Sequence, residues 1–597
     1  MIAYAGDFET TTDENDCRIW AYALCKVDDP EEFHYGTDFE EFMEFCSNSK
    51  KNYTIYFHNL KFDGSFILSW LLNNGFKYIT SKSDRKANTF TTLITDMGQF
   101  YAIEIYFDVN GHHSNKVRIL DSLKIFPNMG VEDIAQAFGL PIHKLEIDYK
   151  KERPKGWKLT KEEIDYIRND VEIMARALNI MFDQGLNKMT IAGDAFASFK
   201  SFMPNFRNRF PILPKQVDAD IRLSYRGGFT YCNDIYCGKE MGKGIKLDVN
   251  SLYPSRMVQE YLPYGTPEFF EGKYKYDKTM PLYIQSLTCK FELKKGKIPN
   301  IQLKNNLSFL PNEYLKSSND ELITVTLCSP DYELFLENYY VTDITYHGGW
   351  KFHQCKGMFD DYINFWMAQK IKATKEGNKP LRTISKRMLN SLYGRFGLSI
   401  RSQQKYPYLD EKGVLRFALL PEEEREPVYI PVACFITSYG RCKTIRTSQK
   451  IRDYSLEKYG KDAYLYSDTD SIACLLNDED LENLKEVIEI DDFKLGYWAK
   501  EESFDRWLMI RQKCYVEEVE GETKVTVAGL PKYLAPIISF DNFKKGFTTE
   551  GLNRDEMVKL ASKNGATLDQ IKKLHPKLTY KYVKGGVILA DTDFTIK

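Results

Sequence analysis

The chain has 597 residues and is 43% hydrophobic, 14% aromatic and 28% charged, which excludes collagen-like, low-complexity and wholly disordered proteins and predicts several domains of roughly 150 residues each. Its formal net charge is only −2, from 82 basic and 84 acidic side chains, so the overall charge indicates neither a nucleic acid nor a membrane nor an acidic partner. The local charge is uneven, because residues 1–50 hold 13 acidic against 3 basic side chains and residues 351–401 hold 11 basic against 3 acidic ones.

Residues 1–188 alternate short apolar strands with helical stretches, a pattern typical of one α/β unit. We predict strands near residues 2–8, 53–57 and 100–107. A long helix should begin after Thr160, because Thr160 and Glu163 form a capping box in front of an apolar stripe.

Acidic side chains recur along this α/β unit. Asp7 and Glu9 lie two apart at a strand end, so both carboxylates point to one face; Asp63 follows the next strand, and Tyr166 and Asp170 are one helical turn apart. Carboxylates at about 4 Å and an effective dielectric near 20 repel by roughly 4 kcal/mol per pair, so a shared site needs cations. Each element alone is more often a solvated surface feature. Their order within one unit favours a nuclease in which two Mg²⁺ or Mn²⁺ ions hydrolyse a phosphodiester and Tyr166 orients the water.

The middle of the chain changes character several times. Residues 246–254 predict a strand that runs into a turn or a helix start, and residues 261–357 are β-rich without catalytic spacing. Residues 358–397 predict two helices, with a break where Asn378 can cap and Pro380 can occupy the first turn of the second helix. The remaining expectations are a charged loop within 398–426, strands around 464–475 and 507–516, and a C-terminal part that begins near Pro531.

A second group of acids lies in the C-terminal half. Asp468 and Asp470 occupy a predicted hairpin tip between two apolar strands, and Asp248 ends another strand. A polar turn is the simpler interpretation of the tip alone. With Asp248 and the backbone carbonyl of Val249, these acids could form a two-metal site for phosphoryl transfer.

A cationic stripe supports that interpretation. Arg382, Lys386, Asn390 and Tyr393 follow helical spacing on one face of the second predicted helix, and Lys372 comes from the helix before it. Cationic groups can pair with triphosphate oxygens as pyrophosphate leaves. A solvated helix face would explain the basic residues alone, but not Asn390 and Tyr393 on the same face.

These motifs together resemble the protein-primed phage type of family B DNA polymerases, represented by the phi29 polymerase. The resemblance covers the whole chain and is carried by Asp7-Phe8-Glu9-Thr10, Tyr56-Phe57-His58-Asn59-Leu60-Lys61-Phe62-Asp63-Gly64, Tyr225-Arg226-Gly227-Gly228-Phe229, Asp248-Val249-Asn250-Ser251-Leu252-Tyr253-Pro254, Met388-Leu389-Asn390-Ser391-Leu392-Tyr393-Gly394 and Asp468-Thr469-Asp470-Ser471.

The resemblance implies a multidomain α/β and α+β fold, in which an RNase H-like 3′→5′ exonuclease domain precedes a right-hand polymerase domain with two insertions. The implied order is exonuclease domain 1–188, first part of the palm 189–260, terminal-protein-region insertion 261–357, fingers 358–397, second terminal-protein-region insertion 398–426, second part of the palm 427–530 and thumb 531–597. Residues 552–580 depart from the family as extra helical sequence in a thumb that is usually brief.

For the exonuclease site the resemblance implies Asp7, Glu9, Asp63 and Asp170 as metal-site acids, Tyr166 and Lys144 as assisting residues, and Glu146 as a further metal ligand. Contacts to a frayed single-stranded 3′ end are implied for Thr10, Tyr56, His58, Asn59, Phe62, Phe66, Ser122 and Leu123. Aromatic faces stack on bases without reading them, which fits this role. Phe62 and Phe66 are four residues apart and could equally form a helix packing face.

For the polymerase site the resemblance implies Asp248 and Asp470 as catalytic acids, with Asp468 and the Val249 carbonyl supporting the metal site. The implied nucleotide pocket is formed by Tyr253, Lys372, Arg382, Lys386, Asn390 and Tyr393, in which Tyr253 would block a 2′-hydroxyl. Primer-strand and template contacts are implied for Tyr225, Gly227, Gly228, Thr437, Arg441, Lys513 and Tyr515, although core or plain surface positions are also open to the last four.

The implied activity is DNA-templated DNA synthesis with 3′→5′ proofreading, using two Mg²⁺ or Mn²⁺ ions in each active site. Implied partners are primer-template DNA, single-stranded DNA, deoxynucleoside triphosphates and a terminal protein that primes replication and contacts the first insertion. The second insertion would encircle DNA and give processive strand displacement to a monomeric enzyme that replicates a viral or mobile-element genome.

Three other function classes share part of this pattern. They are a nuclease whose second half only binds DNA, a scaffold for the terminal protein without catalysis, and an RNA-copying enzyme. The acids present in both clusters argue against the first two, and Tyr253 together with the attached nuclease argues against the third.

The expected location is the cytoplasm, which is the host cytoplasm if the protein is viral. The twelve scattered cysteines form no CxxC pair, the N-terminal residues do not read as a signal segment, and no apolar run approaches about 18 residues, so no disulfide framework and no membrane span are expected.

Overall fold

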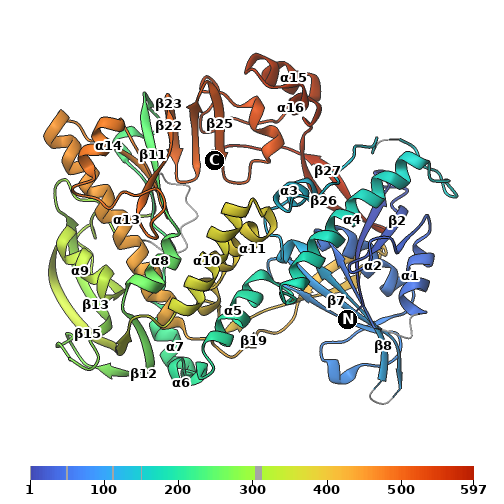
Figure 1. The fold of residues 1–597 in the computed structure, drawn as a ribbon, viewed down its shortest axis with the longest axis horizontal. Coiled ribbons are helices and arrows are strands. Elements are labelled where there is room, and N and C mark those ends of the chain that lie inside the picture. The colour runs from blue at the N-terminus through green and yellow to red at the C-terminus, as the bar shows by residue number, and fades with distance from the viewer. Residues whose placement is uncertain (1, 49–51, 111–112, 150, 303–311) are drawn as a thin grey trace.

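The computed structural model describes residues 2–48, 52–110, 113–149, 151–302 and 312–597. The chain forms two lobes (Figure 1). One lobe is built from the first part of the sequence, and the other is built mainly from residues 230–527, with helices α10 and α11 between them. The last residues return to the first lobe, so the C-terminal segment bridges the two.

An eight-stranded mixed sheet is the centre of the first lobe. Its order is β3-β2-β1-β4-β8-β7-β6-β5. The strands are β1 (Ile2–Thr10), β2 (Ile19–Lys26), β3 (Phe33–Gly36), β4 (Tyr53–Phe57), β5 (Lys77–Tyr78), β6 (Thr89–Ile94), β7 (Phe100–Asn110) and β8 (His113–Asp121). Central strands β1, β4 and β8 run parallel, so their carboxyl ends meet at one edge of the sheet.

Helices cover both faces of this sheet. They are α1 (Phe39–Ser47), α2 (Leu60–Asn73), α3 (Val131–Ala137) and α4 (Lys161–Asp183), with short helices η1 (Lys82–Asp84) and η2 (Ser122–Lys124). Small side chains of β1 and β2, Ala3, Ala5, Ala21 and Ala23, face α4 and let it pack closely. The predicted capping box of α4 is confirmed, since Thr160 Oγ1 accepts from Glu163 N at 3.2 Å and Glu163 Oε2 accepts from Thr160 N at 3.0 Å.

A five-stranded antiparallel sheet is the centre of the second lobe. Its order is β22 (Trp498–Phe504), β11 (Gly244–Val249), β21 (Ser471–Cys474), β20 (Tyr464–Asp468) and β9 (Thr230–Cys232). Helices α8 (Leu252–Gln259), α13 (Ile430–Tyr459) and α14 (Asp478–Leu484) pack in this lobe. The chain reaches it through α5 (Ile191–Phe202), α6 (Phe206–Arg209) and α7 (Lys215–Arg222), and η3 (Asp234–Tyr236) follows β9.

The 30-residue helix α13 was not predicted from the sequence. Pro431 lies in its first turn and Gly460 ends it at a φ of 64°, which are ordinary start and stop signals. The helix has buried residues on most of its circumference. It therefore lacks the one-sided apolar stripe by which a helix is recognised in a sequence.

The two expectations for residues 261–397 are confirmed. The described residues between 262 and 355 include a four-stranded sheet of β12 (Leu262–Phe270), β15 (Tyr339–Cys355), β13 (Leu282–Leu293) and β14 (Ile323–Cys328), with α9 (Ser329–Asn338) against it. Residues 360–396 form helices α10 (Asp360–Glu376), α11 (Lys379–Ser391) and α12 (Tyr393–Phe396). The Asn378 side chain accepts from Leu381 N at 3.0 Å and caps α11 as predicted.

The charged loop expected within 398–426 is confirmed only near its end, where residues 421–426 are exposed and mostly irregular. The segment also forms β16 (Arg401–Ser402), β17 (Lys405–Leu409), β18 (Leu415–Leu419) and β19 (Glu423–Glu424). Asp410 Oδ1 accepts from Lys412 N and Val414 N and closes the β17–β18 turn. Leu415 is fully buried in the core of the first lobe, so the hairpin is stabilised by a contact that is distant in the sequence.

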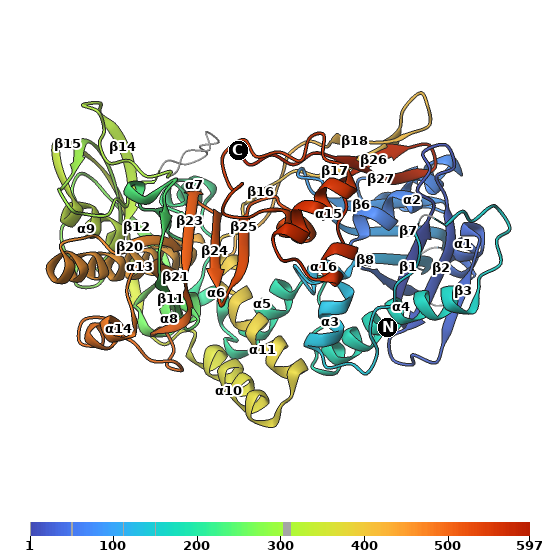
Figure 2. The same cartoon turned by 90° about the horizontal axis from the view of Figure 1, so that it is seen from above.

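The C-terminal part contains a second four-stranded sheet and a final hairpin. The sheet has the order β10 (Glu240–Met241), β23 (Arg506–Arg511), β24 (Cys514–Val519) and β25 (Glu522–Val527), and η4 (Lys532–Ile537), α15 (Arg554–Lys563), α16 (Leu568–Lys572), β26 (Lys577–Val583) and β27 (Gly586–Thr592) follow. The helices expected within 552–580 are present as α15 and α16, but the end of that range is strand β26. The β26–β27 hairpin lies on α2 of the first lobe (Figure 2).

None of the helices in the described ranges combines the length and the hydropathy that crossing a bilayer requires.

Candidate active sites

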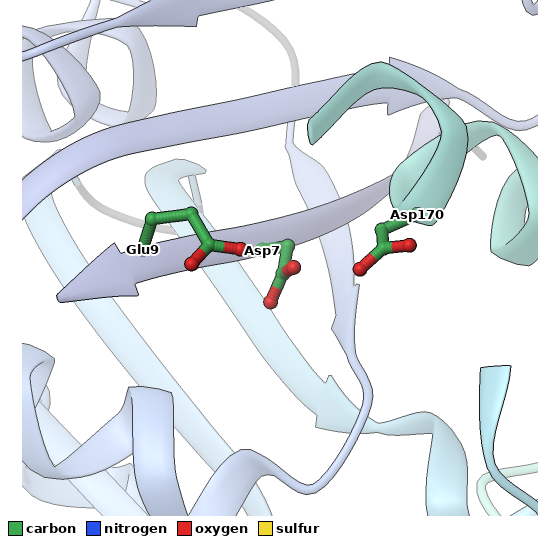
Figure 3. A group of neighbouring side chains, drawn as sticks. All are labelled: Asp7, Glu9 and Asp170. Atoms are coloured by element: carbon green, nitrogen blue, oxygen red, sulfur yellow. The ribbon is translucent and has the colours of Figure 1, made fainter. Parts of the chain in front are cut away.

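Three carboxylates converge in the first lobe. Asp7 and Glu9 project from the same face of β1, and Asp170 projects toward them from α4 (Figure 3). One ligand oxygen from each lies within 4.8 Å of the others. Glu9 and Asp170 are buried and Asp7 is half-buried, so repulsion among these acids is poorly screened by water.

Burial and mutual repulsion raise the pKa values of these acids. The pKa of Asp7 is raised to about 7, chiefly by burial and then by Asp170. Burial is also the main cause of the raised pKa of Glu9 and of Asp170. Lys144 offsets part of the repulsion, since its Nζ lies 2.5 Å from Asp170 Oδ2.

Asp63 adjoins this cluster from the first turn of α2. It is 4% exposed, and its Oδ1 accepts from the backbone N–H of Phe8 at 3.2 Å. Its raised pKa is caused first by burial and then by Asp7. The four acids that the sequence placed in one site therefore lie together.

Glu146 does not join them. Its side chain is exposed, and it is absent from the group of converging carboxylates found among the described residues. Its charge instead acts on Lys573, which follows α16 and whose pKa is raised first by a hydrogen bond to Asp569 and only later by Glu146. The irregular segment that carries Glu146 gives no periodicity from which its direction could be predicted, and its role as a metal ligand stays a prediction.

Tyr166 lies at the edge of the acids and has a partner that the sequence analysis missed. Its hydroxyl is 2.7 Å from the hydroxyl of Tyr149, a residue with 53% of its surface exposed. Tyr149 occupies the same irregular segment as Lys144. It carried no sequence signal beyond its nearness to Lys144.

The residues expected to contact a single strand divide into two groups. Thr10, His58, Asn59, Phe62 and Leu123 are partly exposed. Tyr56, Phe66 and Ser122 are 2%, 3% and 0% exposed, so their side chains pack within the protein in this structure, and their contact with DNA stays a prediction. His58 shares their structural role, since its Nε2 lies 2.8 Å from Met129 O and its Nδ1 lies 3.0 Å from Ser122 Oγ.

The C-terminal hairpin covers part of the same surface. The side-chain amide of Asn59 donates to the Tyr580 hydroxyl at 2.8 Å, and the rings of Phe62 and Tyr580 lie 6.1 Å apart. Phe66 packs beneath Gly586. Tyr580 is thus a further residue of this site that the sequence did not reveal, since it lies more than 500 positions from Asn59.

The second group of acids lies at neighbouring strand ends of the five-stranded sheet. Asp248 of β11 and Asp468 of β20 are both paired with Ser471 of β21, from opposite sides. Asp470 occupies the β20–β21 turn, and its carbonyl accepts from Val249 N at 2.8 Å. The three acids therefore lie together, as the sequence predicted.

Their electrostatics resemble those of the first cluster. The pKa of Asp248 is raised to about 7, first by burial and then by Asp470, while Lys386 lowers it. Burial raises the pKa of Asp470. Lys513 Nζ lies 2.9 and 2.7 Å from the two carboxylate oxygens of Asp468, so Lys513 neutralises one of these acids in this structure.

The predicted cationic stripe faces this second cluster. Arg382, Lys386 and Asn390 are exposed on one face of α11. The rings of Tyr253 and Tyr393 lie 4.1 Å apart and close the space between α8 and α12. Lys372 is exposed on α10.

Lys370 is a residue of this region that the sequence analysis missed. Its pKa is lowered by burial and then by Lys386 and Arg382, so it faces the cationic stripe. It lies two positions before Lys372, and two positions on a helix point in different directions. The sequence alone therefore does not show whether Lys370 or Lys372 faces the cationic stripe; this depends on the orientation of α10.

A glycine in the Tyr225–Gly228 loop permits close contact with the acidic turn. A Cβ on Gly228 would lie 2.5 Å from Thr469 Oγ1, whereas Gly227 has open space around it. Phe229 O accepts from Thr469 N at 2.7 Å. The loop therefore supports the turn between Asp468 and Asp470.

Arg441 supports this loop from within α13, and Thr437 lies one turn before it in the same helix. Arg441 is 3% exposed, forms an ion pair with Asp331 of α9, and donates to the carbonyls of Arg226 and Gly227 at 2.8 Å. Thr437 is 1% exposed and donates to Ala433 O. Both side chains are buried in this structure, and their contact with the primer stays a prediction.

Tyr515 is also engaged inside the protein. Its ring stacks on Trp507 at 4.4 Å and lies 5.2 Å from Tyr466. The side chain is only partly exposed.

Comparisons with known proteins agree over the whole chain. Residues 45–493 match the family model described as DNA polymerase type B, organellar and viral. The DNA polymerase of Bacillus phage phi29 is 41% identical over 614 residues, which cover 100% of this chain and 99% of that protein.

Solved structures show the same likeness. The phi29 DNA polymerase complexed with primer-template DNA and incoming nucleotide substrates has a TM-score of 0.87 and 39% identity, with 100% of both chains covered. The phi29 DNA polymerase complexed with single-stranded DNA has a TM-score of 0.86 and 38% identity, also with 100% of both chains covered.

Proposed function

Because the chain belongs to the organellar and viral DNA polymerases of type B and is of the phi29 type, we propose that it copies a DNA template at the Asp248–Asp470 cluster and removes 3′-terminal nucleotides at the Asp7–Asp170 cluster. The observation that carries this proposal is the presence of two separate acidic clusters on two different sheets.

The first cluster fits divalent cations. Its donors are all carboxylate oxygens, which suit Mg²⁺ and Mn²⁺. One oxygen of Asp170, Oδ1, is buried and has no hydrogen-bond partner, so an acceptor is left free toward the other acids. Asp7, Glu9, Asp63 and Asp170 are the proposed ligands.

Bound divalent ions would supply a nucleophilic water and stabilise the leaving oxygen of the phosphodiester. Tyr166 would hold that water by its hydroxyl, which Tyr149 orients at 2.7 Å. Lys144, paired with Asp170, would approach the phosphate and offset its negative charge. Thr10, Asn59, Phe62 and Leu123 would hold the single-stranded 3′ end.

The second cluster fits the same type of ion by its donors. Asp248, Asp470 and the carbonyl of Val249 are the proposed ligands, and Asp468 would be released from Lys513 to support them. Arg382 and Lys386 would hold the triphosphate and offset the charge of the departing pyrophosphate. The ring of Tyr253 would exclude a 2′-hydroxyl by contact, which favours deoxynucleotides.

The domain assignment follows from these sites. We infer an exonuclease domain at 1–188, a palm in two parts at 189–260 and 427–530, fingers at 358–397 and a thumb at 531–597. Primer-template DNA, single-stranded DNA and deoxynucleoside triphosphates are the proposed substrates, since the related phi29 polymerase structures carry DNA and nucleotides of these kinds.

The two insertions, 261–357 and 398–426, are proposed to serve replication of a viral or mobile genome. The first has exposed aromatic side chains at Tyr276 and Tyr340, 79% and 65% exposed, and would receive a terminal protein that primes synthesis. The second packs on the first lobe through Leu415 and would close around DNA, which would support processive strand displacement by a monomer in the host cytoplasm.

The test separates the two activities. We expect Asp248→Ala to abolish extension of a primed template by at least 10³-fold and to leave trimming of a single strand within twofold of wild type. Asp7→Ala should do the reverse. Asp492→Ala, an exposed acid outside both clusters, is the matched control and should change neither rate.

Loss of both activities in either active-site variant would refute the proposal of two independent sites. Extension of a primer on circular single-stranded DNA with Mg²⁺ and a heparin trap tests processive displacement. Products longer than one circle support it, and products that stop at one circle refute it.

A further inference from the structure

The fingers helix α11 has a second polar face, beside the cationic one. On this face Thr383 Oγ1 donates to Ala137 O at 3.3 Å, and both terminal nitrogens of Arg387 donate to Pro127 O at 3.4 and 3.3 Å. Lys379, the first residue of α11, packs beside Gly139. Helices α3 and α11 thus lie side by side, although one belongs to each proposed activity (Figure 1).

The segment that α11 contacts also supports the exonuclease site. Met129 O, two residues from Pro127, accepts from His58 Nε2 at 2.8 Å. His58 precedes Asn59, whose backbone N–H is held by Asp121 Oδ1 at 3.1 Å. Residues 127–139 therefore touch the fingers helix on one side and the start of α2, which carries Asp63, on the other.

Both side chains that make these contacts are affected by burial. Burial lowers the pKa of His58, so the ring is neutral at pH 7 and its Nε2–H can donate to Met129 O. Burial also lowers the pKa of Arg387, and none of the ion pairs within the described ranges involves its guanidinium. The Pro127 carbonyl is thus the acceptor that compensates the Arg387 guanidinium for its partial burial.

The position of α11 is linked to the proposed nucleotide pocket. The rings of Tyr253 and Tyr393, which are proposed to line that pocket, lie 4.1 Å apart. A nucleotide that inserts between these two rings would separate them. Tyr393 follows α11 after only one residue, so separating the rings moves the end of α11 and disturbs its contact with residues 127–139.

We propose that Arg387 is a positioning residue that ties α11 to residues 127–139, so that binding of an incoming nucleotide and trimming of the 3′ end are coupled through this contact. The inference rests on the proposed function. Nucleotide binding disrupts the contact of Arg387 with Pro127. Removing this contact by substitution therefore favours the nucleotide-bound arrangement. Two hydrogen bonds from one guanidinium to one carbonyl predict a change of about threefold to fivefold.

The experiment compares the full-length wild type with Arg387→Ala, Arg387→Lys and Arg446→Ala. Arg446 is a matched control, because it is an arginine on α13 that pairs with exposed Glu337 and lies far from α3 in the chain. Two titrations with the next correct deoxynucleotide are measured on a primed template. One gives kcat and KM for extension, and the other gives the nucleotide concentration that suppresses trimming by half.

For Arg387→Ala we expect a KM about threefold to fivefold lower, a kcat within twofold of wild type and a half-suppressing concentration lowered by the same factor. Trimming of a single strand without nucleotide should stay within twofold. Arg387→Lys should lie between wild type and Arg387→Ala, because one ammonium can still reach Pro127 O. Arg446→Ala should match wild type.

Four results would overturn the inference. They are an unchanged KM and half-suppressing concentration in Arg387→Ala, a raised KM, an equal shift in Arg446→Ala, or Arg387→Lys indistinguishable from Arg387→Ala. If the wild type itself neither extends nor trims, the proposed function fails instead. The two failures are therefore distinguishable.

Discussion

The buried ion pair between Arg441 and Asp331 gives the sharpest test of how the polymerase site is supported. Its side chains are 3% and 5% exposed, and the same guanidinium donates to the carbonyls of Arg226 and Gly227. Asp331→Leu would leave a buried guanidinium without its carboxylate. Breaking such a pair costs about 3–5 kcal/mol. This cost corresponds to a rise of roughly 10²- to several 10³-fold in the equilibrium constant for local opening of α13.

Native-state hydrogen exchange of the α13 amides measures that opening directly. The control is the double variant Asp331→Leu/Arg441→Met, in which apolar groups replace both charges. Stability should return to within about 1 kcal/mol of wild type, because a buried pair is often no more stable than an apolar replacement. Primer extension should remain low in the double variant, since the carbonyls of the loop have lost their donor.

The reasoning would be refuted by a change in α13 exchange below fivefold in Asp331→Leu. It would also be refuted if the double variant lost as much stability as the single variant, or if it regained full extension. Trimming of a single strand serves as the internal reference, and it should stay within twofold in both variants because the pair lies in the other lobe.

Three further predictions concern the two sites. Gly228→Ala should lower primer extension by at least 10²-fold, because a Cβ there would lie 2.5 Å from the threonine hydroxyl in the acidic turn, whereas Gly227→Ala meets open space and should extend normally; equal activities of the two variants in a steady-state assay would contradict this. Tyr580→Phe should lower the Kd for single-stranded DNA about twofold to tenfold, because it frees the Asn59 amide that the hydroxyl occupies at 2.8 Å, and a higher Kd in a fluorescence titration would show that Tyr580 binds the strand itself. The pKa of Asp7 is raised from 3.8 to about 7, so the ion-free protein should lose stability as pH rises from about 4 to about 7, and Mg²⁺ should restore it at pH 8; a melting temperature that rises over this range without Mg²⁺ would show that the raised pKa is not expressed.

Three of the residues expected to contact DNA are buried in this structure. Tyr56, Ser122 and Arg441 occur in motifs rich in functional residues, yet each is buried, and Ser122 and Arg441 are also hydrogen-bonded within the protein. A motif shows which residues accompany one another, but it does not show which of them face solvent. The supporting and the contacting residues of a site are therefore alike in sequence and are separated only by burial.

The missed features share another reason. Helix α13 lacks a one-sided apolar stripe because other elements surround it. The hairpin within 398–426 is held by Leu415 in the core of the first lobe, and Tyr580 reaches Asn59 across almost the whole chain. Each depends on a partner that is remote in the sequence, so no local window contains the stabilising contact.

Local features could be predicted from the sequence because they depend on residues that are close together in the chain. The capping box of α4, the break before α11 and the same-face placement of Asp7 and Glu9 follow from hydrogen bonds and side-chain directions within a few residues. Only the tertiary structure brought Asp170 onto β1, set Lys513 against Asp468 and laid α11 beside α3. These contacts depend on how whole layers pack, because burial of apolar faces, and not the spacing of any motif, decides which remote strands and helices meet.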